Sequence, residues 1–174
     1  MKLDVIPDRS AQPRPWYAEG LRFTCQQCGN CCTGGPGFVW ISREEIIRLA
    51  EYLKLTPQQT VERYCRKIDG KFSLREHRNA RGEYDCIFLK EQPVPRVDGD
   101  ERVTHTKRIC TVYPVRPLQC RTWPFWSENL KSRQMWEQSG RRCPGMNVGR
   151  NYSQKQIEAL RDAKDWPKRA PTSD

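Results

Sequence analysis

Apolar residues recur at helical spacing in a segment that begins near residue 43. They lie three or four positions apart and share one helical face. These residues are Ile46, Ile47, Ala50 and Leu53. Ser42 and Glu45 have the spacing of a capping box, which marks a helix N-terminus. The sequence therefore predicts a helix over about residues 43–53.

Two further capping boxes predict two more helices. Thr56 and Gln59 flank Pro57, a residue type that suits the first helical turn, and the apolar residues Val61 and Tyr64 follow. A similar pattern stands near the end of the chain, with a serine and a glutamine ahead of apolar residues at helical spacing. Its members are Ser153, Gln156, Ile157, Leu160 and Ala163.

Strand patterns are shorter and lie mainly between residues 71 and 108. The candidate strands are Phe38–Ile41, Phe72–Leu74, Tyr84–Leu89 and Arg102–Thr106, and the last three are separated by Gly70, Gly82 and Gly99. Alternating segments separated by glycine predict a small antiparallel sheet or meander. Residues 113–126 hold too many prolines for a long helix and too many aromatic residues for an exposed loop, so a packed irregular segment is expected there.

These elements predict an α+β fold. We expect one small domain, with short helices, a small antiparallel sheet and long irregular segments around a metal centre. Residues 1–22 are expected to form an extended N-terminal arm that leans on the domain through Trp16 and Tyr17. Residues 23–166 would form the cysteine-cluster domain, and residues 167–174 a polar tail.

The composition predicts a small hydrophobic core, so the fold needs stabilisation from another source. Only 36% of the 174 residues are hydrophobic, and 30% are charged. Nine cysteines could supply additional stabilisation, either as disulfides or as metal ligands. The first 22 residues carry scattered charges and no apolar run of signal-peptide length, and no stretch approaches the roughly 20 apolar residues of a membrane helix. We therefore expect a cytoplasmic protein with no membrane partner and with reduced thiols.

Eight of the cysteines form a pattern typical of metal ligands. Four lie close together in the run Cys25-Gln26-Gln27-Cys28-Gly29-Asn30-Cys31-Cys32. The other four are spread along the chain: Cys86, Cys110, Cys120 and Cys143. Cysteines separated by two residues can direct their sulfurs toward one inorganic centre, and bacterial ferredoxins use the same spacing. If the run were helical, Cys25, Cys28 and Cys32 would share one stripe.

The number and surroundings of these cysteines leave two metals and two partitions open. Four thiolates saturate one tetrahedral zinc or one iron-sulfur cubane, so eight can form two sites, or one site with the other cysteines left unbound. Arg116 and Arg121 flank Cys120 and are the residues expected to offset cofactor charge. Arginines also precede Cys110 and Cys143. Ferredoxin-like spacing and the Cys143-Pro144 dipeptide tilt the prediction toward an iron-sulfur cluster, with zinc still open.

Other residues of metal-binding type fit plainer roles. Cys65 stands alone at the end of the second predicted helix, where a packed free thiol is expected. His77 and His105 lie in charged stretches, where solvated side chains are expected. A disulfide framework is disfavoured, because the expected compartment is reducing and a Cys31–Cys32 bridge would be strained.

The chain resembles the bacterial YkgJ-type cysteine-cluster proteins, a zinc- or iron-chelating family, over roughly residues 23–145. The matching motifs are Cys25-x-x-Cys28-Gly29-x-Cys31-Cys32, Cys86-Ile87-Phe88-Leu89, Cys110-Thr111-Val112-Tyr113, Arg116-Pro117-x-x-Cys120-Arg121-x-x-Pro124-Phe125 and Cys143-Pro144-Gly145. The resemblance implies metal chelation by these eight cysteines. It implies no settled reaction, although a similar cysteine pattern occurs in enzymes that methylate flagellin lysines.

Three functional hypotheses follow. The first is a metal-binding protein that holds zinc or iron, either as a structural staple or as an iron-sulfur centre. The second is an iron-sulfur-dependent enzyme for redox or methyl-transfer chemistry, for which the sequence shows no catalytic motif of a familiar kind. The third starts from the net charge of +10, which suits a basic nucleic-acid-binding module with structural zinc. Basic residues spread along the whole chain without one dense stripe disfavour that third reading.

Overall fold

The three capping boxes start helices at the predicted positions. The computed structural model describes residues 14–94 and 105–163, and in it the helices are α1 (Arg43–Leu53), α2 (Pro57–Tyr64) and α6 (Gln154–Asp162). In each, the N-cap side chain accepts a hydrogen bond from the backbone three residues on, and the Glu or Gln there bonds back. These three predictions are confirmed.

The strands pair only in antiparallel fashion, but they form several small sheets instead of one. A three-stranded sheet has the order β3 (Trp40–Ile41), β5 (Lys71–Leu74) and β4 (Cys65–Ile68). A second has the order β2 (Thr33–Gly34), β7 (Tyr84–Cys86) and β6 (Glu76–Arg78). Two-stranded sheets join β8 (Leu89–Val94) to β9 (His105–Cys110), and β1 (Leu21–Phe23) to β10 (Met146–Tyr152). The fold class, a small α+β domain, is confirmed.

Two strand predictions differ from the structure in their bounds. The predicted strand Tyr84–Leu89 is interrupted after Cys86, because the chain turns there and buries Phe88 to 3% exposure. The predicted strand at 102–106 lies partly outside the described residues, and β9 continues from His105 to Cys110. Alternation of apolar residues did not reveal β4 and β6, because both are rich in charged residues.

The proline- and aromatic-rich segment is more regular than the sequence predicts. It holds the 3-10 turn η2 (Tyr113–Val115) and the helix α3 (Leu118–Thr122), followed by a cis Trp123-Pro124 bond. Pro117 precedes the first turn of α3, a position where its missing N–H is harmless, and Pro124 follows soon after the helix ends. Two more helices complete the fold: α4 (Ser127–Leu130) and α5 (Arg133–Gly140).

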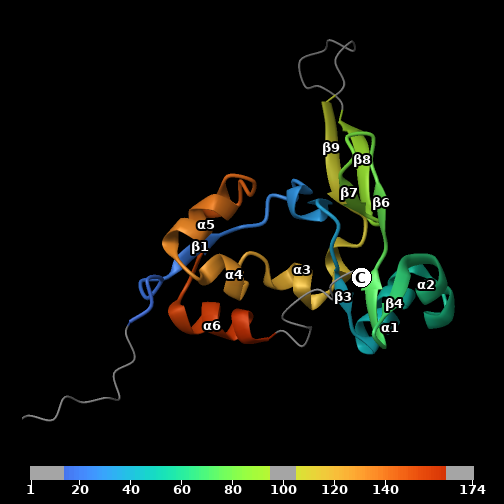
Figure 1. The fold of residues 1–174 in the computed structure, drawn as a ribbon, viewed down its shortest axis with the longest axis horizontal. Helices are drawn as coiled ribbons and strands as arrows, with labels where there is room; N and C mark the ends of the chain where they lie inside the picture. Colours follow the sequence, from blue (N-terminus) through green and yellow to red (C-terminus); the bar gives the residue numbers. More distant parts are fainter. Residues whose placement is uncertain (1–13, 95–104, 164–174) are drawn as a thin grey trace, which may run out of the picture.

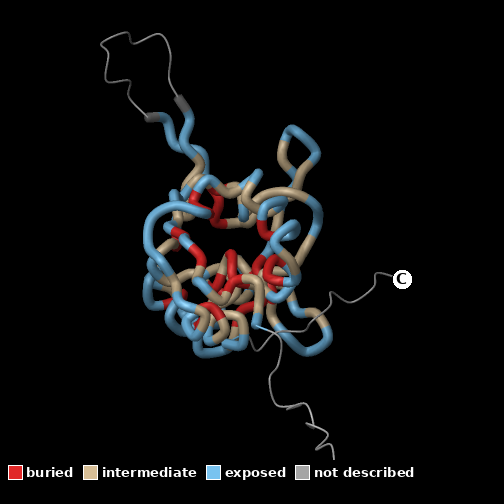
Figure 2. The backbone as a smooth tube through the Cα atoms, turned by 90° about the vertical axis from the view of Figure 1, so that its left-hand side faces the viewer, coloured by how far each residue is buried: buried red, intermediate tan, exposed pale blue. Residues whose placement is uncertain are grey.

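The hydrophobic core is divided into two clusters. The first cluster lies among β1, β10, α4, α5 and α6, and consists of Tyr17, Leu21, Phe23, Phe125, Leu130, Trp136, Met146 and Ile157. The second lies among α1, β4 and β5 and consists of Ile41, Ile46, Leu49, Cys65, Leu74, Phe88 and Val112. In Figure 1 the two groups of elements stand on opposite sides of α3. Figure 2 shows the buried stretches of backbone toward the inside of the chain trace.

The N-terminal segment is tied to the first cluster. Trp16 Nε1 donates a hydrogen bond to the Leu130 carbonyl at 2.8 Å, and Tyr17 is 6% exposed. β1 then begins at Leu21 and pairs with β10 near the other end of the chain. The predicted arm and tail lie mostly in residues 1–13 and 164–174, outside the described residues, and the division into arm, domain and tail stays a prediction.

Candidate metal centre

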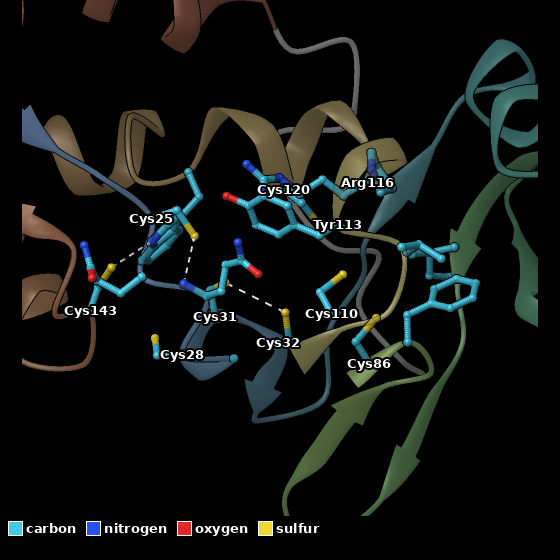
Figure 3. Close-up of a pocket in the computed structure, with 18 of the residues that line it drawn as sticks. Cys25, Cys28, Cys31, Cys32, Cys86, Cys110, Tyr113, Arg116, Cys120 and Cys143 are labelled. Carbon is cyan, nitrogen blue, oxygen red and sulfur yellow. Dashed lines mark hydrogen bonds between the residues drawn. The ribbon is translucent and has the colours of Figure 1, made fainter. Parts of the chain in front are cut away.

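All eight cysteines of the predicted ligand set line one cavity of about 60 Å³. They come from five separate stretches of the chain, and Figure 3 shows them around a common space. The described residues that complete its walls include Phe23, Leu74, Phe88, Val112 and Trp123. By the measure in which one water needs roughly 10–15 Å³, the space holds several atoms. Residues far apart in sequence therefore converge on one cavity.

The cysteine run supplies four of these side chains, but it is not helical. Residues 24–29 lack regular structure, and the 3-10 turn η1 (Asn30–Cys32) follows. The helical geometry that would set Cys25, Cys28 and Cys32 on one stripe therefore does not apply. Gly29 begins η1 in the left-handed region at φ 73°, a conformation that reverses the chain and that glycine adopts at little cost.

The remaining four cysteines lie in or near four different elements. Cys86 ends β7, Cys110 ends β9, Cys120 lies inside the short helix α3, and Cys143 stands three residues after α5. Pairing in the β8–β9 hairpin sets Cys110 opposite Leu89. Side chains held on helices and strands are positioned more precisely than side chains in loops, which suits metal ligation by Cys86, Cys110 and Cys120.

The cavity lies between the two hydrophobic clusters. Cys25 and Cys143 pack against the first cluster, whereas Cys86 and Cys110 pack against the second. In the close-up, Cys28 lies on the side of Cys143 (Figure 3). Any ion held by sulfurs from both sides would join the two clusters.

Hydrogen bonds hold the cysteine run against its surroundings. The Asn30 side chain donates to the Arg142 carbonyl at 2.8 Å and also accepts from the Arg108 guanidinium. Trp123 Nε1 donates to the Cys143 sulfur at 3.4 Å. N–H donors of this kind stabilise a thiolate and tune a metal bound to it.

The thiols are in unequal electrostatic surroundings. Cys31 and Cys32 sulfurs are 3.8 Å apart, and the hydrogen bond between them lowers the pKa of Cys31 to about 7 and raises that of Cys32. Burial raises the pKa of Cys86 to about 11, and it also raises the pKa of Cys120. Without a cation most of these thiols therefore stay protonated at neutral pH, since crowded buried thiolates repel one another.

The two arginines predicted to offset cofactor charge are placed differently. Arg116 lines the cavity, with its guanidinium carbon 3.7 Å from the centre of the Tyr113 ring. Its Nε atom is buried and has no hydrogen-bond partner in the described structure. Arg121 does not line this cavity; its guanidinium lies 3.2 Å from a carboxylate oxygen of Glu45 on α1. Arg116 is therefore the cation that faces the sulfurs.

The donors around the cavity fit a soft or borderline metal. No carboxylate stands among the described residues of its walls, which excludes the oxygen-rich sets that calcium and magnesium require. Sulfur-only donors suit zinc and iron-sulfur clusters. Within the described part of the chain, no three Cys, His, Asp or Glu side chains are close enough together to hold an ion as they stand. Binding would therefore draw the sulfurs inward.

Comparison with known proteins identifies the family. A family model described as "CxxCxxCC: putative zinc- or iron-chelating domain" matches residues 24–144, a span that begins one residue before Cys25 and ends one residue after Cys143. The chain belongs to the CxxCxxCC family. The predicted resemblance is thereby confirmed.

One curated relative is an uncharacterized protein of Methanocaldococcus jannaschii. It is 29% identical over 109 residues, which are 63% of this chain and 48% of the relative. The chain thus matches about half the length of that protein. No solved structure matches the chain. Among the described residues, no helix is long and apolar enough to cross a bilayer.

Two residues for which plainer roles were expected, Cys65 and His77, do not line the cysteine cavity. Cys65 is 2% exposed and belongs to the second cluster, as a packed free thiol should. His77 is exposed on β6 and does not line the cavity. The side chain of His105 falls outside the described residues.

Several wall residues were not singled out as site residues. Tyr113 points its ring into the space between Cys25 and Arg116 (Figure 3). Trp123 donates a hydrogen bond to the Cys143 sulfur. Both belong to the aromatic segment around Cys120, so the signal was their density beside a cysteine. Phe88 and Val112 also line the cavity, and the sequence signal for them was their place in the motifs that begin with Cys86 and Cys110.

Proposed function

We propose that this chain binds zinc or iron through its eight cavity-lining cysteines. The observation that carries the proposal is their convergence on one cavity from five separate stretches of the chain. Free thiols that served only as small hydrophobic residues would be dispersed through the core, as Cys65 is. Family membership supports the same conclusion.

We assign the eight sulfurs to two sets of four, one for each side of the cavity. The first set is Cys25, Cys28, Cys31 and Cys143, and the second is Cys32, Cys86, Cys110 and Cys120. Packing of Cys25 and Cys143 on one cluster, and of Cys86 and Cys110 on the other, supports this division. Cys31 and Cys32 would stand where the two sets meet, one in each.

An iron-sulfur occupant is the finer proposal. Ferredoxin-like spacing in the cysteine run, apolar walls and the Trp123 N–H directed at the Cys143 sulfur all suit such a centre. A bound cluster would supply one-electron transfer, whereas zinc would supply a structural cross-link. In either case Arg116 would offset part of the negative charge of the thiolates.

Anaerobic purification with elemental analysis and a visible spectrum tests the metal. Iron with acid-labile sulfide and a broad brown absorption is expected. Colourless protein that contains zinc would contradict the iron-sulfur proposal and leave the metal-binding proposal standing. Folded protein that lacks transition metals and has freely titratable thiols would overturn both.

Serine substitutions test the division into two sets. Cys143→Ser and Cys86→Ser should each remove about half of the bound metal, because each disables one set and spares the other. Loss of all metal from either variant would show one shared centre and contradict the division. Cys65→Ser is the matched control, since Cys65 lies outside the cavity, and it should keep the full metal content.

A further inference from the structure

A second, larger cavity shares a wall with the metal centre. Its volume is about 590 Å³, within the range of roughly 300–1,000 Å³ that is usual for small-molecule sites. The residues that line both cavities are Phe23, Cys25, Tyr113, Arg116 and Trp123. A molecule in the second cavity would therefore lie directly beside the cysteine run.

The walls of this second cavity combine aromatic rings with arginines. The rings belong to Phe23, Tyr113, Trp123, Phe125 and Tyr152. The arginines are Arg116 and Arg121, on either side of Cys120, and Arg150 in β10. No aspartate or glutamate is among the described residues that line it. Such walls favour a ligand that is both flat or apolar and negatively charged.

Two of the three arginines have no acidic partner in the described structure. Arg121 is paired with Glu45, but neither Arg116 nor Arg150 forms an ion pair with a described residue. Each instead stacks on a tyrosine ring, Arg116 on Tyr113 at 3.7 Å and Arg150 on Tyr152 at 4.9 Å. Stacking leaves the N–H edges of a guanidinium free to bind an oxyanion.

Only part of the Arg116 guanidinium is available to a ligand. Its Nε atom is buried without a hydrogen-bond partner and exposes too little surface for a ligand to reach it. An oxyanion in the second cavity would therefore have to contact Arg116 through the terminal nitrogens of its guanidinium.

We propose that the second cavity binds a small organic anion, in which a carboxylate or phosphate group is attached to an aromatic or similarly flat apolar body. The charged group would pair with Arg150 and Arg116, and the body would pack on the aromatic rings. The ligand would then lie beside Cys25 at the edge of the metal centre. That adjacency rests on the proposed function, whereas the cavity itself is formed by the protein alone.

Calorimetric titration with simple probes tests the site. Phenyl phosphate and benzoate supply the two oxyanions on a ring, benzyl alcohol supplies the ring without charge, and inorganic phosphate supplies charge without the ring. Saturable binding of at least one aromatic anion is expected, about tenfold or more tighter than binding of either control. Comparison of the two anions identifies the preferred oxyanion.

Arg150→Gln should weaken binding of the aromatic anion about tenfold, because it removes one charge-assisted contact. The matched control is Arg63→Gln, which makes the same charge change at an exposed arginine of α2 away from the cavity and should leave affinity unchanged. The proposal is overturned if neither anion saturates, if benzyl alcohol binds equally well, or if both variants lose the same affinity.

Metal content measured on the same samples separates the two proposals. Arg150→Gln should retain the wild-type metal content, because Arg150 does not line the cysteine cavity. Metal-free wild-type protein that still binds the aromatic anion would overturn the proposed function and support the anion site. Protein that has its full metal content but binds neither aromatic anion would overturn the anion site and support the proposed function.

Discussion

Replacement of Gly29 by alanine should destabilise the protein through the cysteine run. Gly29 adopts φ +73°, and an alanine in that left-handed region costs roughly 1–2 kcal/mol. A Cβ there would also lie 2.8 Å from Leu89 Cδ1 and 3.0 Å from Arg108 Cβ. Leu89 is 5% exposed, and the Cβ of Arg108 is fixed by its backbone in β9, so neither can move aside cheaply. Overpacking of this kind adds about 1–3 kcal/mol.

Gly70→Ala is the matched control. Gly70 has φ +78°, but a Cβ there would meet nothing within 4 Å, so only the backbone strain remains. Urea unfolding followed by circular dichroism should therefore show Gly29→Ala to be less stable than Gly70→Ala by about 1–3 kcal/mol. Gly29→Ala should also weaken metal binding, because it pushes the cysteine run away from the β8–β9 hairpin. Equal losses of stability in the two variants would refute the packing argument.

Three further outcomes follow from individual side chains. Burial raises the pKa of Cys86 to about 11, so a metal that binds this thiol must displace its proton. The apparent metal affinity should therefore fall by at least about tenfold for each pH unit between pH 8 and pH 6. Competition with a chelator measures this affinity, and an affinity that does not change with pH would contradict the prediction. In metal-free protein, iodoacetamide should modify Cys31, which is exposed and has a pKa of about 7, well before it modifies the buried Cys65. Peptide mass spectrometry measures both rates, and equal rates would refute the prediction. Glu45→Ala should lower the free energy of unfolding by about 2–3 kcal/mol in denaturant titration, because the Glu45 carboxylate accepts hydrogen bonds from the backbone N–H groups of Ser42 and Leu118. The control Glu51→Ala, at an exposed position of α1, should change the free energy of unfolding little.

Local signals in the sequence predicted three of the described helices well, but not α3, α4 or α5. The Ser42, Thr56 and Ser153 capping boxes start α1, α2 and α6, because a cap depends only on residues within one helical turn. The fold class and the family were also readable, since the cysteine motifs are specific. The separation of the strands into small sheets was not readable, because pairing such as β1 with β10 is decided by contacts far apart in the chain.

The eight cysteines that thiol chemistry groups together lie around one cavity, and their role as ligands stays a prediction. The helical geometry considered for the cysteine run does not apply, because Gly29 reverses the chain inside it. Arg121 illustrates a second difficulty: its neighbour in sequence is Cys120, yet its guanidinium turns to Glu45, because α3 presents adjacent residues to different sides.

The pairing of β1 with β10 bears on how the protein acquires metal during synthesis. β1 lies just before the cysteine run, and its partner strand starts only at Met146. At roughly 5–20 residues per second, a ribosome needs roughly 6–25 s to make the intervening chain. For these seconds β1 has no partner strand, and the cysteine run that follows β1 has been made without Cys143. Metal delivered in that interval would meet an incomplete set of thiols, so loading of the finished site belongs after the synthesis of Cys143 and β10.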